Sequence, residues 1–199
     1  MIRFAKAISF FLHPVVTLLP IPFILVIRFS SDYSYALKWT IFSYAFILTA
    51  GLFVAIGVLL GFFSNFNVSD KRQRPLLFSI ISFTTFCYLM CLLILHGPEI
   101  LFLAVFAIIF ALAIFAIVNN WIKASLHLAT ATGVFLLMGI AYGKYFFGLL
   151  VLIPLLAWSR VKTKEHTLTD TIVGTALGIA VTLMVYLIGK YFFLEMIYS

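Results

Sequence analysis

The sequence predicts an all-α fold, a polytopic transmembrane helical bundle of about six to seven membrane helices. Of its 199 residues, 65% are hydrophobic and only 10% are charged, whereas a soluble domain carries about 25% charged residues. Apolar runs of roughly 20 residues recur, and each is long enough to cross a bilayer as a helix. The runs lack the alternation of membrane strands, so helices are the way to satisfy their backbone in lipid. We therefore expect a multi-pass integral membrane protein, folded as a single domain over residues 1–199.

Seven apolar stretches can be laid out along the chain. They run approximately over 8–28, 38–63, 76–95, 99–118, 122–142, 145–158 and 169–194. The first contains Pro14, Pro20 and Pro22, and proline removes a helical hydrogen bond, so a kinked or partly irregular segment is expected there. The sixth is short and needs tilt or support from its neighbours.

The cations are unevenly distributed between the connections. If all seven stretches cross, the N-terminus and the connections 64–75, 119–123 and 159–168 share one face. That face holds nine of the thirteen cations, namely Arg3, Lys6, Lys71, Arg72, Arg74, Lys123, Arg160, Lys162 and Lys164. The positive-inside rule favours a cytoplasmic location for this face, although a phosphate site concentrates cations for a separate reason. The net charge of +7 indicates anionic lipid or an anionic substrate rather than nucleic acid.

A first polar cluster on this face is "NVSDKRQRP", Asn67 to Pro75. Pro75 suits the first turn of a helix, where its missing N–H costs nothing. Arg74 then lies at a helix N-terminus, where backbone donors already favour an anion. The alternative is a basic interfacial loop.

A second cluster is "NNWIKASLHLA", Asn119 to Ala129. Lys123 and His127 are four residues apart, so we expect them to share a helix face with Ser125 close by. Taken alone, such a histidine is more often a hydrogen-bonded structural residue, and the lysine can simply snorkel, so this cluster by itself is a weak signal.

The third cluster is "SRVKTKEHTLTD", Ser159 to Asp170. Thr167 or Thr169 can cap the last helix, with His166 and Asp170 one turn apart at its start. A carboxylate at that spacing accepts the proton of one imidazole nitrogen and leaves the other basic and nucleophilic. An ionisable residue in a membrane helix is a functional hypothesis by default, and a purely structural His–Asp pair is the alternative.

Together the clusters indicate phosphoryl transfer through a histidine nucleophile. Even numbers of crossings separate them, so their side chains can converge at one membrane surface. The candidate residues are Arg74, Lys123, Ser125, His127, Arg160, His166 and Asp170.

These residues resemble the type 2 phosphatidic acid phosphatase (PAP2) family, integral-membrane lipid phosphatases related to glucose-6-phosphatase and haloperoxidases. The family motif S-R-x5-H-x3-D is matched in full by Ser159, Arg160, His166 and Asp170. The motif P-S-G-H is matched in part by "ASLH", 124–127. The motif K-x6-R-P keeps Arg74 and Pro75 but has Asn67 at its lysine. The resemblance covers about 67–170 and the helix beyond, within a motif-bearing core of about 64–194. Two apparent crossings separate successive motifs, which is similar to the glucose-6-phosphatase layout.

The resemblance implies a metal-independent phosphomonoesterase or diphosphatase with no cofactor. His166 would attack phosphorus, Asp170 would orient it, and His127 would protonate the leaving oxygen and later activate water. The groups implied to hold the phosphate oxygens are Arg74, Arg160 and Ser125, with Lys123 or Lys71 in place of the missing motif lysine. Only six acidic residues occur in the chain, which agrees with a site without Mg²⁺ and disfavours an aspartate-rich isoprenoid transferase.

The alternative is a catalytically degenerate relative that binds or transports a phosphorylated lipid. The altered first two motifs favour it, and the intact third motif and both histidines favour an enzyme. A lipid phosphate or isoprenyl diphosphate in the membrane is the expected partner, and the residues do not select one substrate or an oligomeric state. The family usually places these motifs on the extracytoplasmic face of the cell membrane, so that side is expected despite the charge count.

Overall fold

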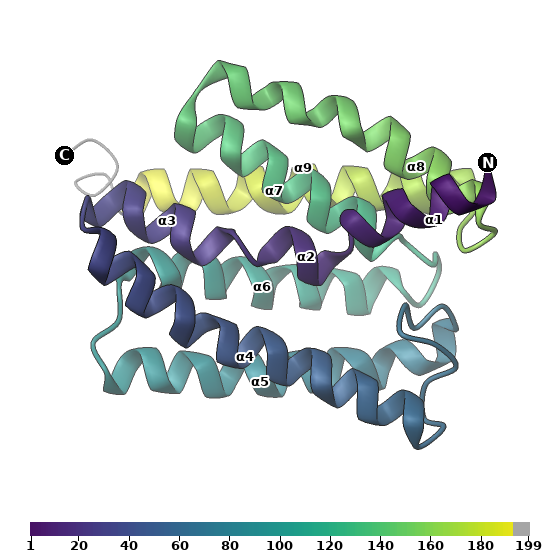
Figure 1. Ribbon diagram of the computed structural model, residues 1–199, viewed down its shortest axis with the longest axis horizontal. Coiled ribbons are helices and arrows are strands. Elements are labelled where there is room, and N and C mark those ends of the chain that lie inside the picture. The colour runs from purple at the N-terminus through teal and green to yellow at the C-terminus, as the bar shows by residue number, and fades with distance from the viewer. Residues whose placement is uncertain (193–199) are drawn as a thin grey trace. The chain divides into compact units, whose positions relative to one another are not determined.

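The computed structural model describes residues 1–192, and this part of the chain is built from helices joined by short connections (Figure 1). The helices are α1 (Ile2–Phe11), α2 (Pro14–Leu18), α3 (Ile21–Ser30), α4 (Tyr33–Leu59), α5 (Arg74–Ile94), α6 (Glu99–Val118), α7 (Leu126–Tyr142), α8 (Leu152–Lys162) and α9 (Leu168–Phe192). Two 3₁₀ helices, η1 (Lys71–Gln73) and η2 (Lys144–Val151), precede α5 and α8. The predicted all-α membrane fold is therefore confirmed.

Five helical segments within residues 1–192 are long and apolar enough to cross a membrane, and the broken α1–α3 segment makes a sixth if it counts as one span. The sixth predicted stretch is longer than expected, because η2 continues into α8 and the two together run from Lys144 to Lys162. The fifth is shorter, because α7 begins only at Leu126 and has 17 residues. At 1.5 Å per residue that is roughly 25 Å, less than the hydrocarbon core of about 30 Å.

Prolines interrupt the first apolar stretch as the sequence predicts. Pro14 occupies the first turn of α2, where no backbone donor is lost, and His13 immediately before it is the N-cap. Pro20 lies in the break between α2 and α3. The stretch is therefore three short helices instead of one continuous span.

The described chain packs as two compact units. The first combines Met1–Ile21 with the chain from Trp121 onward, and the second is Pro22–Asn120. The expectation of a single domain stays a prediction.

Small residues hold α7 and α9 together in the first unit. A Cβ added at Gly174 would lie 2.5 Å from the carbonyl oxygen of Ser125, and one added at Gly178 would lie 2.5 Å from that of Ala129. The two glycines are one helical turn apart, so they let the backbones approach along one seam, as small residues do in membrane helix pairs. This close approach positions the start of α7 against the start of α9.

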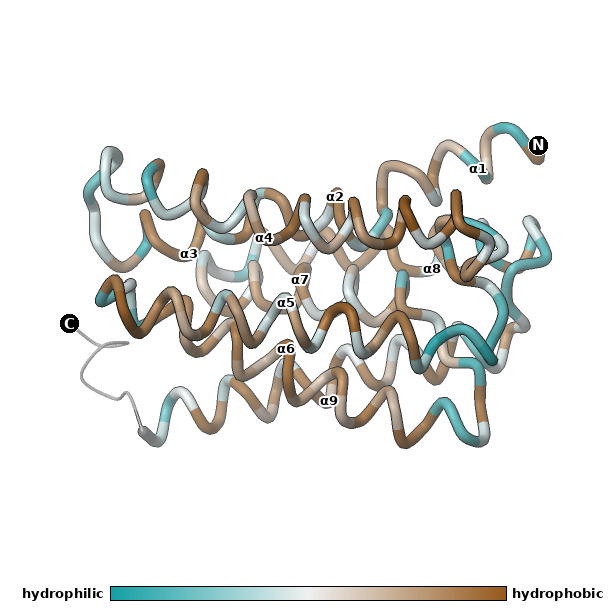
Figure 2. The backbone as a smooth tube through the Cα atoms, turned by 90° about the horizontal axis from the view of Figure 1, so that it is seen from below, coloured by the Kyte–Doolittle hydropathy of each residue, from teal (hydrophilic) through white to brown (hydrophobic). Residues whose placement is uncertain are grey.

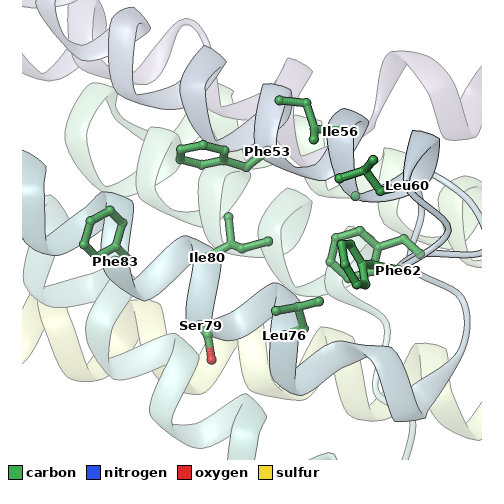
Figure 3. A pocket seen from close by; sticks show the side chains of 10 residues that line it. Phe53, Ile56, Leu60, Phe62, Leu76, Ser79, Ile80 and Phe83 are labelled. Carbon is green, nitrogen blue, oxygen red and sulfur yellow. The ribbon is translucent and has the colours of Figure 1, made fainter.

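The second unit packs α4 on α5 and α5 on α6. The Ser43 and Tyr88 hydroxyls, 2.7 Å apart, link α4 to α5. The connection from α4 to α5 is largely polar, in contrast to the helices that it joins (Figure 2). Near this connection, a groove of about 470 Å³ opens between the two helices and is lined by apolar side chains such as Phe53, Ile80 and Phe83 (Figure 3). No candidate functional residue lines it.

Candidate active site

The end of α8 turns the chain so that His166 returns beside Arg160. Lys164 adopts a left-handed conformation with φ 59°. The backbone N–H of Glu165 donates to the Arg160 carbonyl at 3.1 Å, and that of Lys164 donates to the Val161 carbonyl at 3.0 Å. These two bonds form a Schellman motif, which satisfies carbonyls at a helix C-terminus. The His166 N–H also donates to the Arg160 carbonyl, at 3.3 Å.

A capping box at the start of α9 fixes the carboxylate of Asp170. The Thr167 N–H donates to Oδ2 of Asp170 at 2.9 Å, and the Asp170 N–H donates to Oγ1 of Thr167 at 3.2 Å. Thr167 is therefore the cap of the last helix, while Thr169 lies inside it. The same Oδ2 lies 3.5 Å from Nδ1 of His166. This geometry directs Nδ1 of His166 toward the carboxylate and leaves Nε2 as its other reactive atom.

The start of α7 is tied directly to the start of α9. The Ser125 N–H donates to the Asp170 carbonyl at 3.0 Å, across the close approach that Gly174 permits. Ser125 is the N-cap residue of α7, but its side chain makes no capping hydrogen bond. Its Oγ is fully buried and has no hydrogen-bond partner among the described residues. A buried hydroxyl that lacks a hydrogen-bond partner and lies at a helix N-terminus can donate to an anionic oxygen of a ligand.

Lys123 also reaches the third motif, although not in the way that the sequence predicted. Its Nζ donates to the carbonyl oxygen of Glu165 at 2.8 Å. The expectation that Lys123 shares a helix face with His127 is wrong, because α7 begins at Leu126 and Lys123 lies in the preceding non-helical segment. The reason is that Ser125 takes the extended N-cap conformation, with φ −79° and ψ 111°, so the helix cannot include Lys123.

Arg160 is buried in the last turn of α8, with 2% of its surface exposed. Its Nη2 lies 3.8 Å from the Glu165 carboxylate, and its Nη1 donates to Oγ of Ser9 at 3.5 Å. Its Nε has no hydrogen-bond partner among the described residues. A buried guanidinium with these long contacts and an unused donor is strongly drawn to a further anionic ligand.

His127 and His13 lie ring against ring in the first unit. The His127 side chain, on the first turn of α7, is 4% exposed. The ring of His13 stands perpendicular to it, with the ring centroids 4.9 Å apart. His13 is not among the residues that the motifs single out, yet a histidine within an apolar run is costly in a membrane and is itself a signal.

Ser159, the first residue of the third motif, attaches α8 to α1. Its Oγ donates to the carbonyl oxygen of Ala5 at 2.6 Å and lies 2.7 Å from Oγ of Ser9. A hydroxyl has one proton, so Ser9 must donate to Ser159. Ser159 therefore holds the N-terminal helix in place, and both of its partners lie in α1, outside the three motifs.

The first-motif residues belong to the second unit. Arg74 begins α5, is 2% exposed, and donates from Nη1 to Oδ1 of Asn119 at 3.1 Å. Lys71 donates from Nζ to the carbonyl oxygen of Asn120 at 2.9 Å. Within this unit the 64–75 connection therefore meets the chain just after α6. Pro75 lies in the first turn of α5, as the sequence predicts.

Comparison of the chain with known protein families gives a match over the part that carries the second and third motifs. The PAP2 superfamily model matches residues 120–194. The matched residues include Ser125, His127, Arg160, His166 and Asp170, all of which belong to the first unit. The match leaves out the first-motif residues and the whole N-terminal segment.

No curated protein and no solved structure matches the chain. Among residues 1–192, no group of three or more His, Cys, Asp or Glu side chains is placed to hold a metal ion. The PAP2 superfamily generally comprises phosphatases, so the match over residues 120–194 supports a phosphatase-like family.

Proposed function

We propose that the protein is a metal-independent membrane phosphatase that hydrolyses a lipid phosphate or isoprenyl diphosphate through a phosphohistidine intermediate. The observation that carries this proposal is the junction of α7 and α9. There the Ser125–Asp170 backbone bond joins the second motif to the His166–Asp170 pair.

In the first step, Nε2 of His166 attacks phosphorus while the bond from phosphorus to the leaving oxygen breaks. Oδ2 of Asp170 faces Nδ1 and stabilises the positive charge that develops on the ring. His127 gives its proton to the leaving oxygen, so the lipid departs as a neutral alcohol or as the shorter phosphate. The phosphoryl group remains on His166.

In the second step, a water molecule gives a proton to the now neutral His127 and attacks phosphorus. The P–N bond breaks, inorganic phosphate leaves, and both histidines return to their starting states. Ser125 Oγ and the guanidinium of Arg160 supply donors for the equatorial oxygens, and Lys123 supplies a further cation. Such preorganised donors are worth most in a buried site.

The second candidate is a degenerate relative that binds or moves a phosphorylated lipid without hydrolysing it. The observation in its favour is Asn67 at the position of the motif lysine. It predicts saturable lipid-phosphate binding with no release of phosphate.

One experiment separates the two. Purified wild-type protein, His166→Ala and His127→Ala are incubated with phosphatidic acid, phosphatidylglycerophosphate and an isoprenyl diphosphate, each with and without EDTA. If the protein is a phosphatase, the wild type releases phosphate, EDTA leaves this release unchanged, and His166→Ala abolishes it. Binding without release by the wild type supports the second candidate, and release by His166→Ala at the wild-type rate contradicts the assigned nucleophile.

The site is proposed to face the extracytoplasmic side of the cell membrane. The test uses Lys162→Cys, an exposed position in the last turn of α8, in a background without Cys87 and Cys91. A membrane-impermeant thiol reagent should label it in intact cells. Labelling only after the cells are opened places the site inside.

A further inference from the structure

We propose that His13 is a positioning residue for His127, so that the N-terminal segment α1–α2 forms part of the active site. This inference rests on the proposed function, because it assigns a role toward the general acid of that reaction. It concerns a segment outside the PAP2 match.

The segment is attached to the site by a chain of hydrogen bonds with a defined direction. Nη1 of Arg160 has only protons to give, so it donates to Oγ of Ser9 at 3.5 Å. Ser9 in turn donates to Ser159 at 2.7 Å, and Ser159 donates to the Ala5 carbonyl at 2.6 Å. Ser159 is 0% exposed and Ser9 is 9% exposed, so these bonds are protected from water. α1 is therefore fixed against α8, next to the phosphate-binding arginine.

The orientation of the His13 ring is set by its own backbone. Nδ1 of His13 accepts the Val15 N–H at 3.3 Å as the N-cap of α2. Because that lone pair is occupied, the neutral ring carries its proton on Nε2. α2 packs on α7 in the same unit, and the capped ring stands edge-to-face with His127.

A perpendicular ring at this distance restricts how His127 can turn. Aromatic pairs favour this arrangement at centroid separations of about 4.5–7 Å, and the 4.9 Å observed lies at the close end. His127 must keep one orientation to give a proton to the leaving oxygen and take one from water. Small errors in the placement of reacting groups are expensive, since a displacement of about 1 Å can cost roughly 100-fold in rate.

Two substitutions separate the ring contact from the capping role. His13→Asn keeps a side-chain oxygen that can cap α2 but removes the ring, because asparagine is a preferred N-cap residue. His13→Phe keeps an aromatic ring against His127 but cannot accept the Val15 N–H. If His13 positions His127, His13→Asn lowers kcat on the order of tenfold with KM little changed, and His13→Phe retains more of the wild-type kcat. If His13 only caps α2, the order of the two variants is reversed, and that result overturns the proposal.

A second measurement tests the contact without any turnover. Carbethoxylation of His127 by diethyl pyrocarbonate is followed by mass spectrometry in the wild type, His13→Asn and His13→Phe. The proposal predicts faster labelling of His127 in His13→Asn only, because its covering ring is lost. Equal labelling in all three proteins contradicts it. If the wild type released no phosphate, the proposed function would fail, while this labelling result would still decide whether His13 fixes His127.

Discussion

Replacing Gly174 by alanine tests the close approach of α7 and α9 on which the site depends. The added Cβ would lie 2.5 Å from the Ser125 carbonyl oxygen, 3.0 Å from its nitrogen and 3.2 Å from its carbonyl carbon. All three are backbone atoms, so no side chain can rotate away. Reaching the 3.4 Å of ordinary van der Waals contact requires the two helices to separate by about 0.9 Å.

Separating the two helices should lower both the free energy of unfolding and kcat. Overpacking of this kind costs about 1–3 kcal/mol, and stretching the Ser125–Asp170 hydrogen bond adds about 1 kcal/mol. A displacement near 1 Å between Ser125 and the His166–Asp170 pair should lower kcat roughly 100-fold. The assay is phosphate release by purified protein, with the midpoint of thermal unfolding measured on the same samples.

Gly51→Ala is the matched control. Gly51 lies within α4, and an added Cβ there meets nothing within 4 Å. Alanine has the higher helix propensity, by about 1 kcal/mol, so this control should be at least as stable as the wild type and fully active. Wild-type activity and stability in Gly174→Ala would refute the reasoning about the helix seam.

Three further variants test individual contacts. Lys123→Met should reduce phosphate release at least about tenfold, because one charge-assisted phosphate contact is worth about 1.5–3 kcal/mol. Lys71→Met should leave phosphate release near the wild-type rate, and the reverse order would assign the role to Lys71. Ser159→Ala should lower the free energy of unfolding by about 1–2 kcal/mol through loss of its two hydrogen bonds, with KM unchanged, and a raised KM would instead indicate substrate contact. Lys164→Gly should raise the free energy of unfolding by about 0.5–1 kcal/mol, since glycine adopts the left-handed conformation at φ 59° without strain. A loss of stability in denaturant titration would contradict this.

The sequence predicted the parts of the site that depend on local spacing. The His166–Asp170 pair and the two candidate caps, Thr167 and Thr169, lie within a few residues of one another, so helix start signals suffice to bring them together, and the structure selects Thr167. The start of α7 was placed too early, because the apolar run from Ile122 obscured the capping preference of Ser125. The correct predictions and the error all concern residues that are close together in the sequence.

Contacts between distant segments were beyond the sequence. Nothing near His13 indicates that its ring meets His127, because that contact arises from the packing of α2 on α7. Likewise, only the fold shows that the hydroxyl of Ser159 is hydrogen-bonded to the Ala5 carbonyl and the Ser9 hydroxyl. Contacts between residues that are far apart in the sequence depend on tertiary packing, which neither hydrophobic periodicity nor motif spacing encodes.

The most direct test of the proposed mechanism is to isolate the phosphoenzyme. Wild-type protein is mixed with a substrate labelled in its transferable phosphoryl group, quenched in alkali, in which phosphohistidine survives, and mapped by mass spectrometry. We predict one acid-labile phosphoryl group on Nε2 of His166, because Nδ1 faces Asp170, and none in His166→Ala. Rapid hydrolysis by the wild type with no trapped phosphohistidine, or label on His127 instead, would contradict the mechanism.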